Sequence, residues 1–107
     1  MPNYIIAYLG GAKPETPEQG QQQMGKWKAW VENLGAAAVN PGTPLSSIRI
    51  VGPDGSVAEG SGDDTFHGFT VVEAESLDAA IAMAQACPYL EIGGSLEVAE
   101  MMQMPGG

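Results

Sequence analysis

The sequence predicts an α+β domain in which an antiparallel four-stranded sheet carries two helices on one face. Three observations support this prediction. The chain has 107 residues, enough for one domain with a two-layer core. Apolar, β-prone runs and helical patterns follow in the order strand, helix, strand, hairpin, strand, helix, strand. No repeat or linker divides the chain, so we expect a single domain over residues 1–107 with a loosely held tail at 103–107.

The first half opens with a strand and a well-marked helix. Residues 3–9 are an apolar run rich in aromatic and β-branched side chains, which favour a strand. Thr16 is a good helix N-cap, Pro17 suits the first helical position, and Gln19 completes a capping box. Gly35 can adopt the left-handed conformation that ends a helix.

An apolar stripe runs along this first helix. Met24, Trp27, Val31 and Leu34 recur at helical spacing, so we expect these four side chains to be buried. Trp30 lies one turn beyond Trp27, on the flank of the stripe, and is therefore the tryptophan more available to a ligand.

The remaining strands follow from composition and turn signals. Residues 36–40 predict a short strand, and 47–51 and 56–59 flank Gly-Pro-Asp-Gly, which predicts a hairpin. Residues 66–74 are apolar on both faces, as in a strand that is covered on both sides. Residues 95–102 alternate apolar and polar side chains and predict the last strand.

The second helix lies between these last two strands. Ser76 is its N-cap, Asp78 lies in the first turn where the helix dipole favours negative charge, and Pro88 ends it. We expect one face of this helix to be buried, formed by Leu77, Ala80, Ile81 and Ala84.

Two strand–helix–strand units with right-handed crossovers form the ferredoxin-like plan, here with an extra hairpin. Two helices cover one face of such a sheet. The other face carries apolar side chains too, because the strands at 3–9 and 66–74 are apolar on both faces. A second copy of the sheet is the simplest cover, so we expect a homodimer that forms through the face away from the helices.

Composition limits the partners of this domain. Four Lys and Arg against thirteen Asp and Glu give a net charge of −9, which disfavours nucleic acid and anionic membranes. The N-terminus lacks a signal-peptide pattern and no run approaches the roughly 20 apolar residues of a membrane span, so we expect a cytoplasmic protein. Cys87 is the single cysteine and is expected to be a small buried hydrophobe.

The C-terminal half also carries the pattern of a known family. It reads Gly68-Phe-Thr-Val-Val-Glu-Ala-Glu-Ser-Leu-Asp-Ala-Ala-Ile, and Ala86-Cys-Pro and a Gly-Gly pair precede the last strand. In this stretch, the Met-x-x-Trp helix and the Pro-Gly-Thr-Pro-Leu segment, the chain resembles the YCII-related (DGPF) domain family. The resemblance covers nearly the whole chain. It implies a ferredoxin-like fold that dimerises through its sheets into a dimeric α/β barrel with a cleft between protomers.

The chain departs from this family at positions to which the resemblance assigns function. Members nearest the name-giving branch carry a helix histidine and an aspartate after the second strand as a proposed acid/base pair. The histidine position falls at Met24 here, and the segment after Pro41-Gly42 reads Thr-Pro-Leu-Ser-Ser, without aspartate. The DGPF motif is altered as well, since the loop reads Gly62-Asp-Asp-Thr-Phe. We expect Met24 to be helix packing and not a site residue.

His67, the single histidine, has two interpretations. It is the best general base in the chain, and Asp63 or Asp64 could orient it, which makes it the catalytic candidate. Alternatively it is a hydrogen-bonded residue at a strand entry, because a Gly-rich loop cannot fix a His–Asp geometry. One histidine with scattered carboxylates has no metal-ligand spacing, so the sequence predicts neither a metal nor another cofactor.

Tyr4, Tyr8 and Trp30 are the ligand-binding candidates. The two tyrosines share a strand face with Ile6 by the two-residue period. If this face looks into a cleft between protomers, their hydroxyls are polar handles in an apolar pocket; otherwise they fill the dimer interface.

Three functional hypotheses remain open from the sequence. The first is a homodimer that binds a small apolar or aromatic molecule in the cleft between subunits. The second is a cofactor-free enzyme of dimeric α/β-barrel type, resembling isomerases or small monooxygenases, with His67 as general base. The third is a non-catalytic accessory or interaction module. The fold cannot decide among them, because it hosts many chemistries.

Overall fold

The computed structural model describes residues 1–12, 14–60 and 65–102. The predicted loop aspartates Asp63 and Asp64 and the predicted tail lie outside the described residues. The elements are β1 (Asn3–Gly10), α1 (Pro17–Leu34), η1 (Gly35–Ala37), β2 (Ala38–Pro44), β3 (Arg49–Val51), β4 (Val57–Glu59), β5 (Phe66–Glu73), α2 (Leu77–Gln85), η2 (Pro88–Ile92) and β6 (Gly94–Glu100).

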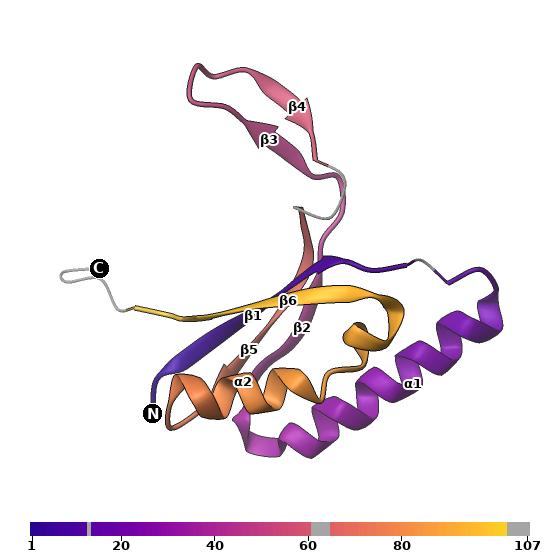
Figure 1. Cartoon of the computed structure of the whole chain (residues 1–107), viewed down its shortest axis with the longest axis vertical. Helices are drawn as coiled ribbons and strands as arrows, with labels where there is room; N and C mark the ends of the chain where they lie inside the picture. Colours follow the sequence, from indigo (N-terminus) through magenta and orange to yellow (C-terminus); the bar gives the residue numbers. More distant parts are fainter. Residues whose placement is uncertain (13, 61–64, 103–107) are drawn as a thin grey trace.

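The four long strands form an antiparallel sheet in the order β2-β5-β1-β6, and β3 pairs with β4 in a separate hairpin. Both helices lie on the same side of the sheet, as Figure 1 shows. This confirms the predicted ferredoxin-like α+β plan with an extra hairpin.

The predicted turn and capping signals act as expected. The Thr16 side chain accepts a hydrogen bond from the backbone N–H of Gln19 at 3.1 Å, and Gly35 has φ 56° just after α1. The Gln19 side chain accepts from the N–H of Glu15, one residue before the position expected for a capping box. The Ser76 hydroxyl likewise caps α2 by accepting from the N–H of Ala79.

The helix-covered face of the sheet forms the core. On β1 it carries Tyr4, Ile6 and Tyr8, opposite Val72, Thr70 and Gly68 of β5. Tyr4 is 1% exposed and Ile6 is fully buried beneath the helices. The expectation that this face looks into a cleft between protomers, or fills a dimer interface, is therefore wrong.

The helices are rotated from the orientation that their apolar stripes predicted. Trp30 is 4% exposed and donates its indole N–H to the carbonyl of Met83, while Met24 is 52% exposed. The prediction that Met24 is buried and Trp30 free is wrong. On α2, Ala80 and Ala84 are buried as expected but Leu77 and Ile81 are exposed. Ala80 and Ala84 belong to the same buried cluster as Trp30, and their small side chains leave space for its large ring.

The opposite face of the sheet has no helix over it in the described structure (Figure 1). It carries the residues that alternate with the core positions: Ile5, Ala7, Leu9, Phe69, Val71 and Ala99, with Glu97 and Ser95 on β6. Most of these side chains are partly or fully exposed. We call this surface the open face.

The β3–β4 hairpin projects from the sheet on the side away from the helices (Figure 1). All six of its strand residues are exposed. Its turn is the predicted one, with Gly55 at φ 86° and a hydrogen bond from the Gly55 N–H to the carbonyl of Gly52.

Candidate functional site

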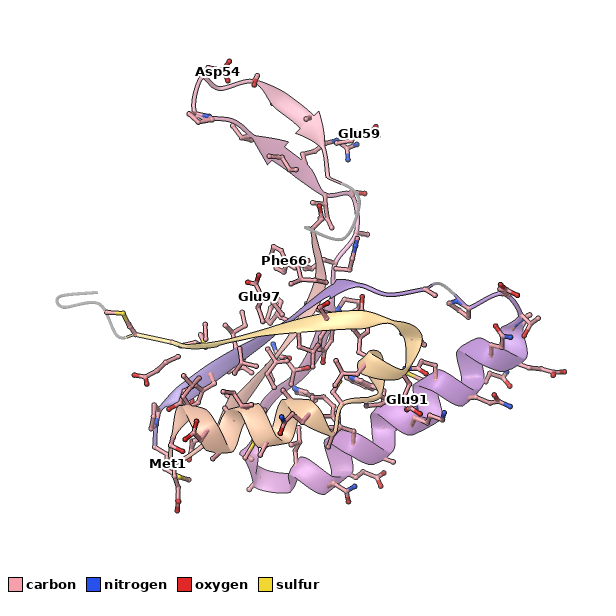
Figure 2. All side chains as sticks on the ribbon, viewed as in Figure 1. Met1, Asp54, Glu59, Phe66, Glu91 and Glu97 are labelled. Atoms are coloured by element: carbon pink, nitrogen blue, oxygen red, sulfur yellow. The ribbon has the colours of Figure 1, made fainter. Side chains whose placement is uncertain are left out.

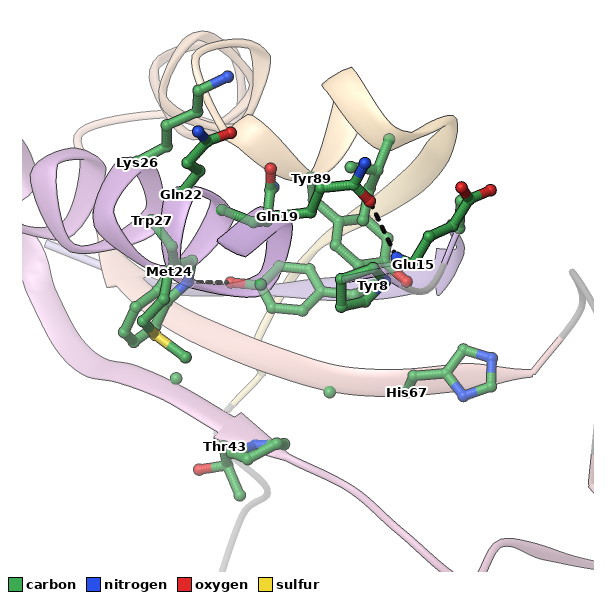
Figure 3. A pocket seen from close by; sticks show the side chains of 18 residues that line it. Tyr8, Glu15, Gln19, Gln22, Met24, Lys26, Trp27, Thr43, His67 and Tyr89 are labelled. Carbon is green, nitrogen blue, oxygen red and sulfur yellow. Dashed lines mark hydrogen bonds between the residues drawn. The ribbon is translucent and has the colours of Figure 1, made fainter. Parts of the chain in front are cut away.

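A cavity of about 680 Å³, within the range of ligand pockets, opens on the helix side of the sheet. It lies between the N-terminal half of α1, the ends of β1, β2 and β5, and η2 (Figure 3). Its walls are largely aromatic and apolar, and the residues used below are Tyr8, Met24, Trp27, Thr43, His67 and Tyr89.

The hydroxyl of Tyr8 is anchored inside the protein. It bonds the hydroxyl of Thr70, which donates in turn to the carbonyl of Pro41 at 3.1 Å. Because the Thr70 hydroxyl donates its proton to the carbonyl of Pro41, Tyr8 is the donor in its bond with Thr70. The Tyr8 oxygen in turn accepts the indole N–H of Trp27 at 3.5 Å. Burial raises the pKa of Tyr8, and the bonds to Thr70 and Trp27 offset part of that rise. Tyr8 therefore stays a neutral phenol near pH 7 and offers the cavity mainly its ring.

Tyr89, on η2, is held in the same way. Its hydroxyl donates to the carbonyl of Gly10, and its ring stacks on Tyr8 with centroids 5.0 Å apart. Glycines make room for it, because an added Cβ would lie 2.1 Å from the ring at Gly94 and 2.9 Å from it at Gly11. The two tyrosines thus form a fixed aromatic wall.

Trp27 is the third aromatic side chain of the cavity and lies close to Met24 in Figure 3. A Cβ at Gly42 of β2 would lie 2.4 Å from its ring, so β2 packs directly on the indole. The N-terminal half of α1 is tied to η2 by two contacts: Gln23 donates to the carbonyl of Pro88 at 3.0 Å, and Lys26 pairs with Glu91 at 3.3 Å. Both contacts help to hold the helix over the cavity.

His67 reaches the cavity through an irregularity in β5. Tyr8 pairs with Gly68 and Leu9 pairs with Phe66, so His67 is the extra residue of a β-bulge. Strict alternation from Gly68 would direct His67 to the open face, whereas the bulge places it in the cavity lining. It lies at the end opposite Trp27 and Met24 (Figure 3).

The position at which the family resemblance expects a histidine, Met24, lines this cavity, and so does Thr43 of the segment that lacks the expected aspartate. Met24 offers a thioether and Thr43 a hydroxyl, which hydrogen-bonds Asn40 at 3.2 Å. Neither group exchanges a proton readily near neutral pH, so the imidazole of His67 is the better-suited proton acceptor at this site.

The sequence candidates divide between this cavity and the core. Tyr8 and His67 line the cavity, whereas Tyr4 is in the core and Trp30 lines a smaller cavity of about 330 Å³ between the helices. Sequence reasoning missed Trp27, which it assigned to the core, and Tyr89. The sequence signal that could have identified Tyr89 is its position directly after Cys87-Pro88, where the chain leaves α2 and forms η2.

The described residues contain no group of three or more His, Cys, Asp or Glu side chains that could hold a metal ion. Within the same residues, none of the helices has the length and apolar character needed to cross a membrane. Cys87 is 2% exposed, as expected, and burial raises the pKa of its thiol.

Comparison with known proteins extends this description. Among curated proteins, none matches the chain. A solved structure of similar fold is 5-chloro-2-hydroxyhydroquinone dehydrochlorinase from Burkholderia phenoliruptrix, in complex with 2,5-dihydroxybenzoquinone. It is 20% identical, 95% of each chain is covered, and the TM-score is 0.56. The YCII-related domain family matches residues 5–105. The chain therefore belongs to the YCII-related domain family.

Proposed function

We propose that this protein binds a small, planar aromatic molecule in the cavity lined by Tyr8, Trp27 and Tyr89. The observation that carries the proposal is the anchoring of all three rings. Their hydroxyl and indole N–H groups bond to one another or to the protein, so the walls are already in place for a flat, apolar guest. The quinone bound by the structural relative is a ligand of this shape.

The two tryptophans provide a test with an internal control. In an NMR titration with 2,5-dihydroxybenzoquinone, and separately with uncharged phenol, the indole N–H signal of Trp27 should shift. The signal of Trp30, buried against α2, should stay in place. The variant Trp27→Phe identifies which indole N–H signal belongs to Trp27. It should also weaken ligand binding at least about tenfold, because it alters the aromatic contact and removes the indole N–H.

A matched variant at a distance is Val51→Thr, which lies on the hairpin and should bind either compound as the wild type does. If neither compound moves the Trp27 signal at millimolar concentration, or if both indole signals move together, the proposal is wrong.

A second candidate function is a cofactor-free enzyme in which His67 acts as general base. The bulge favours it, because the irregularity brings the imidazole of His67 to an aromatic pocket, where it joins the Glu15 carboxylate as a group able to accept a proton. If the protein converts a bound aromatic compound, His67→Ala should abolish turnover while the Trp27 signal still shifts on titration. Unchanged turnover in His67→Ala would rule out this role.

We also propose that the protein is a homodimer that forms through the open face. The support is the row of apolar side chains on β1 and β5, with no helix over them in the described structure. A stable dimer needs a buried area of about 1,200 Å² or more. Light scattering during size exclusion at tens of micromolar tests this, and a monomer would contradict it.

A further inference from the structure

The β3–β4 hairpin has exposed apolar side chains that its own domain leaves uncovered. Ile50 is 51% exposed, Val51 68% and Val57 65%, and Val51 and Val57 face each other directly across the two strands. Apolar side chains exposed to this degree on both strands of one ribbon are typical of a contact surface.

The hairpin is also too small to be stable by itself. Each strand has three residues, and an isolated two-stranded hairpin is at best marginally stable in water. The radius of gyration of the chain is 15.2 Å, against about 13 Å for a compact domain of this length. The excess agrees with an arm that stands outside the compact body. Both observations agree with a partner that covers the hairpin.

The position of the arm indicates which partner. The hairpin rises on the same side of the sheet as the open face, where Phe66 and Glu97 also point (Figure 2). Any molecule that covers the open face lies beside the arm. In a twofold dimer each protomer covers the open face of the other, so the arms of both protomers would be covered at once.

One side chain of the arm, Arg49, is complementary in charge to the open face of a second copy. The chain has a net charge of −9, and Arg49, its single arginine, lies on the arm. The Arg49 guanidinium donates to the carbonyl of Ile48, and no carboxylate of the described residues forms an ion pair with it. The open face carries the exposed carboxylate of Glu97. The hairpin also carries Asp54 and Glu59, so its complementarity to the acidic open face is local to Arg49.

We propose that the β3–β4 hairpin is a dimerisation arm, which clasps the second copy that covers the open face and buries Ile50, Val51 and Val57 against it. This inference rests on the homodimer proposed above. It assigns a role to a segment that neither the core nor the cavity uses.

The test compares dimer affinity in matched variants. Two arm variants are compared: the double variant Val51→Thr/Val57→Thr alters one face of the hairpin, and Ile50→Thr alters the other. Both keep β-branched side chains. At least one should raise the dimer dissociation constant by at least about tenfold, measured by sedimentation over a dilution series. The control is Ile81→Gln, which replaces an exposed apolar side chain of α2 on the helix side of the sheet. It should leave the dimer dissociation constant unchanged.

Hydrogen exchange provides the second readout. The amides of β3 and β4 should be protected above the dissociation constant and exchange rapidly after dilution to the monomer. A wild-type monomer at tens of micromolar would overturn the dimer and the arm together. A dimer that is unaffected by both arm variants, or whose hairpin amides stay unprotected, would overturn the arm alone.

Discussion

The two ends of the helix-covered face contain the same residue types and serve different purposes. At one end Tyr4 and Trp30 are buried in the core; at the other Tyr8 and Trp27 line a cavity. Tyr4 and Tyr8 lie on one face of β1, and the two tryptophans are three residues apart on α1. We call these regions the closed end and the cavity end.

The difference comes from the second helix. α1 has 18 residues and α2 has nine, so at about 1.5 Å per residue α1 is about twice as long. α2 packs over the closed end, where its alanines admit the Trp30 ring. At the cavity end the place of a helix is taken by η2, a five-residue segment that carries Tyr89. A short second layer leaves a cavity where a longer one would make a core.

The largest expected effect comes from truncating the two tryptophans. Trp30→Ala should lower the free energy of unfolding by about 3–5 kcal/mol, because it opens a void in the core and leaves the Met83 carbonyl without its donor. Trp27→Ala should cost clearly less, since this ring is half-buried, yet it should remove ligand binding. Urea denaturation and the NMR titration measure the two effects. Equal losses of stability would mean that the two ends do not differ.

A smaller effect is expected from filling the space beside the aromatic wall. In Gly94→Ala the new methyl would lie 2.1 Å from the Tyr89 ring, so the ring must leave its place against Tyr8. We expect a loss of about 1–3 kcal/mol and weaker ligand binding.

Gly25→Ala is the matched control, because no atom lies within 4 Å of the new methyl and the site is inside α1. It should stabilise the protein by about 0.5–1 kcal/mol and leave binding unchanged. A Gly94→Ala protein that binds and unfolds like the control would show that the wall is not rigid.

The smallest effect concerns alkaline pH. Burial raises the pKa of Tyr8 above its ordinary value of 10.0 in the folded state. The neutral phenol is therefore favoured by folding, so this contribution to stability is complete below pH 10 and is lost as pH rises through the folded pKa. Stability should fall less steeply above pH 10 in Tyr8→Phe than in the wild type. Urea denaturation between pH 8 and 11 measures this, and parallel curves would contradict it.

Much of the fold could be predicted because its signals are local. Thr16, Ser76, Gly35 and Gly55 act where they stand in the chain, through caps and turns that depend on a few neighbouring residues. The strand and helix order then leaves few topologies.

The site could be predicted only in part because it depends on packing between distant segments. A two-residue period shows that Tyr4 and Tyr8 share a face, but with apolar residues on both faces it does not show which one the helices cover. The helical period places Trp27 and Trp30 on adjacent positions, and the small residues of α2 decide which is buried. His67 was identified by its chemistry, while the bulge that places it in the cavity has no signature in the sequence.

The bulge at His67 also bears on how this protein can change over generations. Loss of the single codon for residue 67 would join Phe66 to Gly68, and these two residues already pair with Leu9 and Tyr8. The pairing of β5 with β1 would become regular, and the backbone bond lost would be the one that the His67 carbonyl accepts from the Leu45 N–H. An in-frame insertion or deletion of three nucleotides can therefore add or remove the imidazole of the pocket without changing the register between β1 and β5.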